Sequence, residues 1–207
     1  DQISLLFTIW AVAYVIFEIP SGALADFYSR KNTIAFGYLA RGVGFLLWFW
    51  YPSFWGIAAG FTLWALSIAC WSGAETAMFH DELSSVGKER LFTKFSGVSE
   101  SVFMIGSVIG YLMGAVLSHL GFRTLSLISA FPSICAGIIL LLAHEATREK
   151  HTHYIHVMKS SFLSIINSKV LLYLASVLFV THQTIGVVEE YIPRIFYTNG
   201  ISIAGVG

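Results

Sequence analysis

Long apolar stretches alternate with short polar segments along the whole chain. A membrane-spanning helix needs about 20 mostly apolar residues to cross a hydrocarbon core about 30 Å thick. Six stretches meet this requirement: residues 3–23, 32–51, 54–78, 96–118, 122–143 and 169–190. Turn and charge signals fill the gaps between them. The pattern therefore predicts an all-α membrane protein, a polytopic helical bundle with short connections.

Composition supports a membrane protein and narrows its partners. Hydrophobic residues make up 56% of the chain and charged residues only 12%, whereas soluble domains carry about 25% charged residues. The net charge of zero provides no overall field that would attract nucleic acid. The chain has no glycine-rich phosphate-binding or dinucleotide-binding motif. We therefore expect the lipid bilayer as a partner, no nucleic acid and no cofactor.

The distribution of basic residues orients the predicted spans. Nine of the twelve Lys and Arg residues fall in the first, third and fifth connections. Cytoplasmic loops carry an excess of Lys and Arg, so these three connections are predicted to face the cytoplasm of a multi-pass cell (inner or plasma) membrane protein. The first span then runs from outside to inside, and we expect at least one further helix to precede it.

The first connection carries a recognisable motif. The segment Gly22-Ala-Leu-Ala-Asp26-Phe-Tyr-Ser-Arg30-Lys31 resembles the G-x-x-x-D-R/K-x-G-R-K/R signature that the major facilitator superfamily places between its second and third helices. The segment departs from it at Phe27 and Ser29, where a basic residue and a glycine are usual. Residues 72–90 also resemble the end of the fourth helix and the following loop in bacterial, drug-efflux-like members.

The resemblance implies a domain organisation and a function. Residues 1–143 would be helices two to six of an N-terminal six-helix bundle, 144–168 a central cytoplasmic loop, and 169–207 the start of the C-terminal bundle. Such proteins are secondary-active transporters that move small organic molecules by alternating access, here as efflux, with a proton or other coupling ion as a possible partner. Four residues would form the gating motif: Gly22, Asp26, Arg30 and Lys31.

Glycines at four-residue spacing mark one face of the fourth long stretch. Gly106, Gly110 and Gly114 lie on the same side of a helix, where the absence of side chains lets another backbone approach closely. Simple helix packing is the first interpretation of this face. The alternative is a packing surface that slides during a transport cycle.

Ionisable residues inside the predicted spans are candidates for the cavity or for ion coupling, because insertion of a central charge costs about 2.5 to 3.5 kcal/mol. Arg41 lies near the middle of its span and needs a carboxylate, carbonyl oxygens or a water-filled cavity. The alternative to a functional role is a structural ion pair, for which Glu18 and Glu75 are the nearest carboxylates by depth. The remaining candidates are Glu100 and His182.

Other constellations favour different functions. His80 and Asp81, with the inner carboxylates, suggest an intramembrane lipid-modifying enzyme, although no nucleophile or oxyanion site accompanies them. Asp81 is equally placed to cap or anchor the helix that leaves the membrane. A non-transporting receptor or scaffold is a third class. His151, His153 and His156 lack a Cys, Asp or Glu framework for a metal site, so a solvated linker is favoured and no metal is expected. The sequence thus favours a carrier without catalytic residues.

Overall fold

The computed structural model describes residues 2–145, 163, 166–174 and 176–177. Within these residues every regular element is a helix, which confirms the predicted all-α fold. The helices and two short 3₁₀ segments are α1 (Gln2–Phe27), α2 (Arg30–Trp50), α3 (Phe54–Trp71), α4 (Ala74–Ser85), η1 (Glu89–Leu91), α5 (Phe92–Leu117), η2 (Ser118–Leu120) and α6 (Gly121–Leu142).

Four helical stretches in the described part of the chain are long and apolar enough to cross a membrane: Gln2–Phe27, Arg30–Trp50, Phe54–Ser85 and Glu89–Leu142. The last contains both α5 and α6, which meet at Gly121 with a φ of 78°. These stretches contain the first five predicted spans to within one residue. Most of the sixth, 169–190, lies outside the described residues, as does most of the predicted central loop.

The predicted span 54–78 is broken in the structure. Its helix ends at Trp71, and a new helix, α4, begins at Ala74 after Gly73 adopts a φ of 63°. This left-handed conformation is costly for residues that carry a Cβ. The second helix then continues to Ser85, beyond His80, where the sequence indicated a loop. Asp81 therefore lies on a helix.

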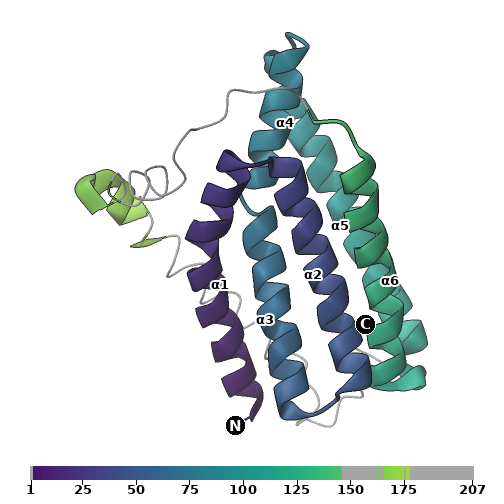
Figure 1. Cartoon of the computed structure of the whole chain (residues 1–207). Helices are drawn as coiled ribbons and strands as arrows, with labels where there is room; N and C mark the ends of the chain where they lie inside the picture. The colour runs from purple at the N-terminus through teal and green to yellow at the C-terminus, as the bar shows by residue number, and fades with distance from the viewer. Residues whose placement is uncertain (1, 146–162, 164–165, 175, 178–207) are drawn as a thin grey trace.

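The helices form a row in the order α1, α3, α2, α6, with α5 behind α2 and α6 in the view of Figure 1. Small residues bring α2 close to its neighbours. A Cβ added to Gly44 would lie 3.0 Å from the Gly60 carbonyl oxygen on α3, and one added to Gly42 would meet the Ile134 side chain on α6. Close backbone approach of this kind is how helices gain packing energy in lipid.

Helix α5 makes few contacts with the row. None of its residues is buried, and a Cβ added to Gly106, Gly110 or Gly114 would meet nothing within 4 Å among the described residues. The described residues thus supply no partner for the glycine face. Its role in helix packing stays a prediction.

An aromatic cluster joins α2, α3 and α6 at the end of the bundle where α2 finishes. The Trp48 ring lies 5.2 Å from that of Phe61 and 6.1 Å from that of Trp64, both on α3, and 5.9 Å from that of Phe122 on α6. The Trp48 indole N–H also donates to the Ile57 carbonyl at 3.0 Å. Aromatic pairs at these separations add to the energy of area burial, so Trp48 fixes α2 between α3 and α6.

At the opposite end, α2 and α6 bind each other's termini. The Glu145 carboxylate, just beyond α6, accepts hydrogen bonds from the backbone N–H of Arg30 at 2.9 Å and of Lys31 at 3.3 Å. Its other oxygen accepts from the hydroxyl of Ser29, the N-cap residue of α2. The Lys31 ammonium in turn donates to the carbonyls of Leu141 and Ala143 at 3.1 and 2.8 Å.

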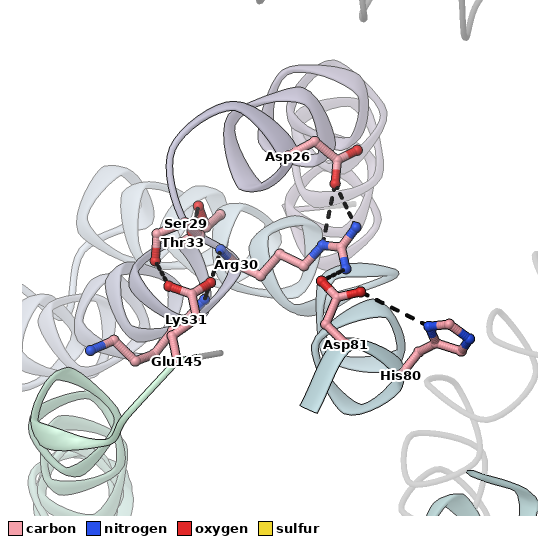
Figure 2. Close-up of polar contacts among 8 residues, drawn as sticks. All are labelled: Asp26, Ser29, Arg30, Lys31, Thr33, His80, Asp81 and Glu145. Atoms are coloured by element: carbon pink, nitrogen blue, oxygen red, sulfur yellow. Dashed lines mark hydrogen bonds and ion pairs between the residues drawn. The ribbon is translucent and has the colours of Figure 1, made fainter. Parts of the chain in front are cut away.

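This exchange satisfies polar groups that each helix end leaves open. It also places an anion at the positive end of the α2 dipole and a cation at the negative end of the α6 dipole. Figure 2 shows Glu145 between Ser29 and the start of α2. The pairing therefore holds the first turn of α2 against the last turn of α6.

The Glu145 contacts predict a local effect on amide exchange. Replacing Glu145 with Ala should speed hydrogen exchange at the Arg30 and Lys31 amides about 2- to 30-fold, because loss of an N-cap acceptor costs about 0.5–2 kcal/mol. Residue-resolved exchange mass spectrometry measures this. The Gly56 amide, bonded to Ser53 at the start of α3, is the internal control and should not change. Equal exchange at Arg30 in both proteins would contradict the assignment of Glu145 as a cap.

Candidate functional site

The predicted gating motif lies where α1 gives way to α2. Asp26 is in the last turn of α1, Ser29 is the extended N-cap residue, and Arg30 is the first residue of α2. The Ser29 hydroxyl accepts from the Asn32 N–H at 3.0 Å, an N-capping bond that serine forms well. The cap fixes where α2 begins, and so places the Arg30 side chain beside the end of α1.

The Arg30 guanidinium binds two carboxylates from different helices. Its Nε and Nη2 donate to Asp26 Oδ1 at 3.3 and 3.1 Å, and its Nη1 donates to Asp81 Oδ2 on α4 at 2.5 Å. Figure 2 shows the guanidinium between the two acids. We refer to Asp26, Arg30 and Asp81 as the Arg30 cluster. It joins the C-terminal end of α1 and the N-terminal end of α2 to the C-terminal half of α4.

Electrostatics explain why these charges need one another. An acid at the C-terminus of α1 and a cation at the N-terminus of α2 both oppose the local helix dipole. The Arg30 side chain is 17% exposed and that of Asp81 29%, while that of Asp26 is 37% exposed. Partial burial limits screening of the Arg30–Asp81 pair by solvent and salt. Removing either acid would leave a half-buried guanidinium with one fewer partner.

Only part of the predicted motif acts together. Asp26 and Arg30 bind each other, whereas Lys31 binds the last carbonyls of α6. A Cβ added to Gly22 would meet nothing within 4 Å among the described residues, so the structure gives that glycine no contact that requires it. The gating role of these four residues remains a prediction.

Sequence reasoning missed two acids at this end of the bundle. The sequence suggests acid-base chemistry or a role at a helix end for Asp81, whereas α4 continues to Ser85 and Asp81 binds Arg30. No motif in the sequence marks Glu145. The signal that could have found it is its position directly after an apolar helix, where a carboxylate can meet the start of an antiparallel neighbour.

Arg41 does not form the ion pair expected from its depth. Its Nε donates to the buried Ser67 hydroxyl of α3 at 3.1 Å, and its guanidinium carbon lies 5.5 Å from the centre of the Tyr38 ring. No ion pair joins it to Glu18 or Glu75 in the described part of the chain. The reason is position: Arg41 lies where α2 meets α3, whereas the two acids lie at other helix contacts.

The membrane carboxylates have separate neutral partners. Glu18 on α1 accepts from the Ser72 hydroxyl at 2.7 Å, and its other oxygen, Oε2, is buried without a hydrogen-bond partner. Glu75 on α4 accepts from Ser99 on α5 at 3.4 Å. Glu100 is exposed on α5 near Glu75. His182 lies outside the described residues.

The arrangement of His80 and Asp81 differs from that of a catalytic acid-base pair. His80 Nδ1 lies 3.9 Å from Asp81 Oδ1, and the His80 side chain is 57% exposed, while Asp81 is engaged by Arg30. Among the residues that the structure describes, no three His, Cys, Asp or Glu side chains gather as metal ligands. His151, His153 and His156 fall outside them.

Comparison with known proteins places this architecture in a family. A family model described as the Major Facilitator Superfamily matches residues 1–206. An uncharacterized transporter of Buchnera aphidicola is 26% identical over 205 residues, which are 97% of this chain and 51% of that protein. A class H tetracycline resistance protein of Pasteurella multocida is 30% identical over 152 residues, covering 70% of this chain and 34% of the relative.

A third relative comes from an archaeon. An uncharacterized transporter of the major facilitator type from Methanocaldococcus jannaschii is 26% identical over 164 residues. These are 78% of this chain and 42% of that protein. The chain thus spans about half the length, or less, of these relatives. No solved structure matches it. With nearly every residue covered by the family match and apolar helices throughout the described part, this multi-pass membrane chain belongs to the Major Facilitator Superfamily.

Proposed function

We propose that the protein containing this chain is a secondary-active carrier that moves small organic molecules across the cell membrane by alternating access, in the export direction. Transport is favoured over catalysis because Asp81, the acid that an enzyme would need beside His80, is bound to Arg30. Family membership supports transport in general. The tetracycline resistance protein among the relatives makes tetracycline a suitable first probe of export.

The observation that carries this proposal is the Arg30 cluster. It ties α1, α2 and α4 together at one end of the bundle, which the distribution of basic residues assigns to the cytoplasm. An alternating-access carrier needs contacts at this end that hold in one state and release in the other. We propose that the Arg30 cluster is such a latch, made when the cytoplasmic side is closed.

The latch predicts the effect of neutralising its acids. Asp26→Asn and Asp81→Asn should each slow tetracycline flux in proteoliposomes about tenfold or more, because hydrogen bonds to charged groups contribute about 1.5–3 kcal/mol. Since both acids act through Arg30, the double variant should lose less than the two single losses combined.

Glu89→Gln is the matched control for this experiment. It makes the same chemical change at an exposed position near the same end of the bundle and outside the cluster, and it should transport normally. Full activity in Asp81→Asn at unchanged membrane abundance would eliminate the latch. Slow transport in Glu89→Gln as well would show that any loss of negative charge at this end is harmful.

Orientation is tested separately by cysteine labelling. In a protein with Cys70 and Cys135 changed to Ala, a cysteine at Ser85 should react with a membrane-impermeant maleimide only from the cytoplasmic side, and one at Ser53 only from outside. These positions are at the end of α4 and in the α2–α3 connection, which lie at opposite ends of the bundle (Figure 1). Labelling of the Ser85 position from outside would invert the assignment.

A further inference from the structure

One cation inside the bundle has no counter-ion among the described residues. Arg41 lies in the middle of α2 and is partly buried. Its Nε donates to the Ser67 hydroxyl at 3.1 Å, and the centre of the Tyr38 ring lies 5.5 Å from its guanidinium carbon. Both partners are neutral. A charge removed from water is costly unless an opposite charge compensates it, so Arg41 needs an anion that these contacts do not provide.

The acids of the neighbouring helices are engaged elsewhere. Glu18 on α1 accepts from Ser72, and Glu75 on α4 accepts from Ser99. Neither forms an ion pair with Arg41 in the described part of the chain. The anion that Arg41 needs is therefore not one of the acids that the structure places beside α2 and α3.

The two terminal nitrogens of Arg41 remain available. Among the described residues, neither Nη1 nor Nη2 has a hydrogen-bond partner, and neither is enclosed by protein. Because Ser67 binds only Nε, it fixes the guanidinium and leaves the edge formed by Nη1 and Nη2 open. The planar guanidinium binds the paired oxygens of an oxyanion through parallel N–H groups. The open edge thus has the donors that an anionic group requires.

Aromatic rings extend from this edge toward the end of α3. Tyr38 lies one turn before Arg41 on α2, and Trp71 lies one turn after Ser67 on α3. Both steps lead toward the same end because these helices are antiparallel. The Trp71 ring stacks on that of Phe103 on α5 at 6.2 Å, and Phe103 is more than half exposed. Ring surface beside a cation suits an organic anion better than an inorganic one.

The position of Arg41 decides which ligand fits. Cations within membrane helices face the interior of the bundle or a water-filled cavity, and Arg41 points toward α3. We propose that Arg41 is the anion-binding residue of a substrate site and that the substrate is an organic oxyanion with an aromatic body. The oxyanion accepts from Nη1 and Nη2, and the body lies against Tyr38 and Trp71. The inference rests on the proposed carrier function and names its substrate class.

Binding of two matched probes tests the site without transport. Benzenesulfonate and benzenesulfonamide share one ring and differ in charge at neutral pH. The full-length protein in lipid nanodiscs should bind the sulfonate about tenfold more tightly or better, because charge-assisted hydrogen bonds are stronger than neutral ones. Saturation-transfer NMR titration measures both affinities, with empty nanodiscs as the blank. Equal affinities in the wild type would overturn the proposal.

Substitution of Arg41 assigns this selectivity to its guanidinium. In Arg41→Gln the ratio of the two affinities should fall close to one. Arg41→Lys keeps the charge but lacks the planar fork, so its ratio should lie between those of Arg41→Gln and the wild type. Circular dichroism will report whether each variant folds. A folded Arg41→Gln with the wild-type ratio would overturn the proposal. If that variant does not fold, an unchanged ratio in Arg41→Lys would do so.

Arg123→Gln is the matched control. Arg123 makes the same two kinds of contact as Arg41, since its Nε donates to the Phe49 carbonyl at 2.9 Å and its guanidinium carbon lies 5.4 Å from the centre of the Phe49 ring. It is exposed near the start of α6. Arg123→Gln should keep the wild-type ratio. A ratio that falls equally in this variant would overturn the assignment to Arg41.

Transport measurements separate this site from the carrier function. Selective binding of benzenesulfonate through Arg41, in a protein that moves neither benzenesulfonate nor tetracycline in proteoliposomes, would leave the anion site standing and refute the carrier. Tetracycline flux in a protein that shows no preference for benzenesulfonate would leave the carrier standing and overturn the anion site.

Discussion

One end of this bundle depends on one guanidinium shared by two acids. Arg30 begins α2 and Asp26 ends α1, so each charge opposes the dipole of its own helix. Together they offset that cost, and Asp81 adds a second acid from α4. Without Arg30, two carboxylates from two helices would face each other at short range. A single side chain thus links three helices at this end.

The break between α3 and α4 makes this arrangement possible. Because α3 stops at Trp71 and Gly73 redirects the chain, α4 can carry Asp81 to Arg30. The segment is then held to α1 at two points, by Glu18 near its start and through the Arg30 cluster near its end. In our proposal, the contact through the Arg30 cluster changes with the transport state.

Much of this fold could be predicted from the sequence, because the apolar stretches and basic connections carry strong, local signals. Asp26 and Arg30 lie four positions apart within the motif Gly22 to Lys31, so their contact is local in the sequence. Asp81 and Glu145 could not be placed in this way. Their contacts with α2 join positions 51 and 115 residues apart, and such contacts depend on how whole helices pack.

Arg41 shows a second limit of sequence reasoning. Depth in the membrane ranked Glu18 and Glu75 as its partners, but depth does not tell which face of each helix a residue occupies. Because α3 lies between α1 and α2, Arg41 on α2 binds Ser67 of α3. Glu18 on α1 instead binds Ser72, at the contact between α1 and the end of α3. The break at Gly73 was likewise hidden, because a glycine inside an apolar run does not reveal its φ.

A distance measurement tests the latch most directly. Spin labels at Tyr28, an exposed residue between α1 and α2, and at Ser85, the exposed last residue of α4, report the separation that the Arg30 cluster controls. With conformation-selective binders holding the full-length protein in each state, pulsed electron spin resonance should give a short, narrow distribution when the cytoplasmic side is closed. It should give a longer, broader one when that side is open. Identical distributions in both states would make the Arg30 cluster a permanent joint and contradict its role as a latch.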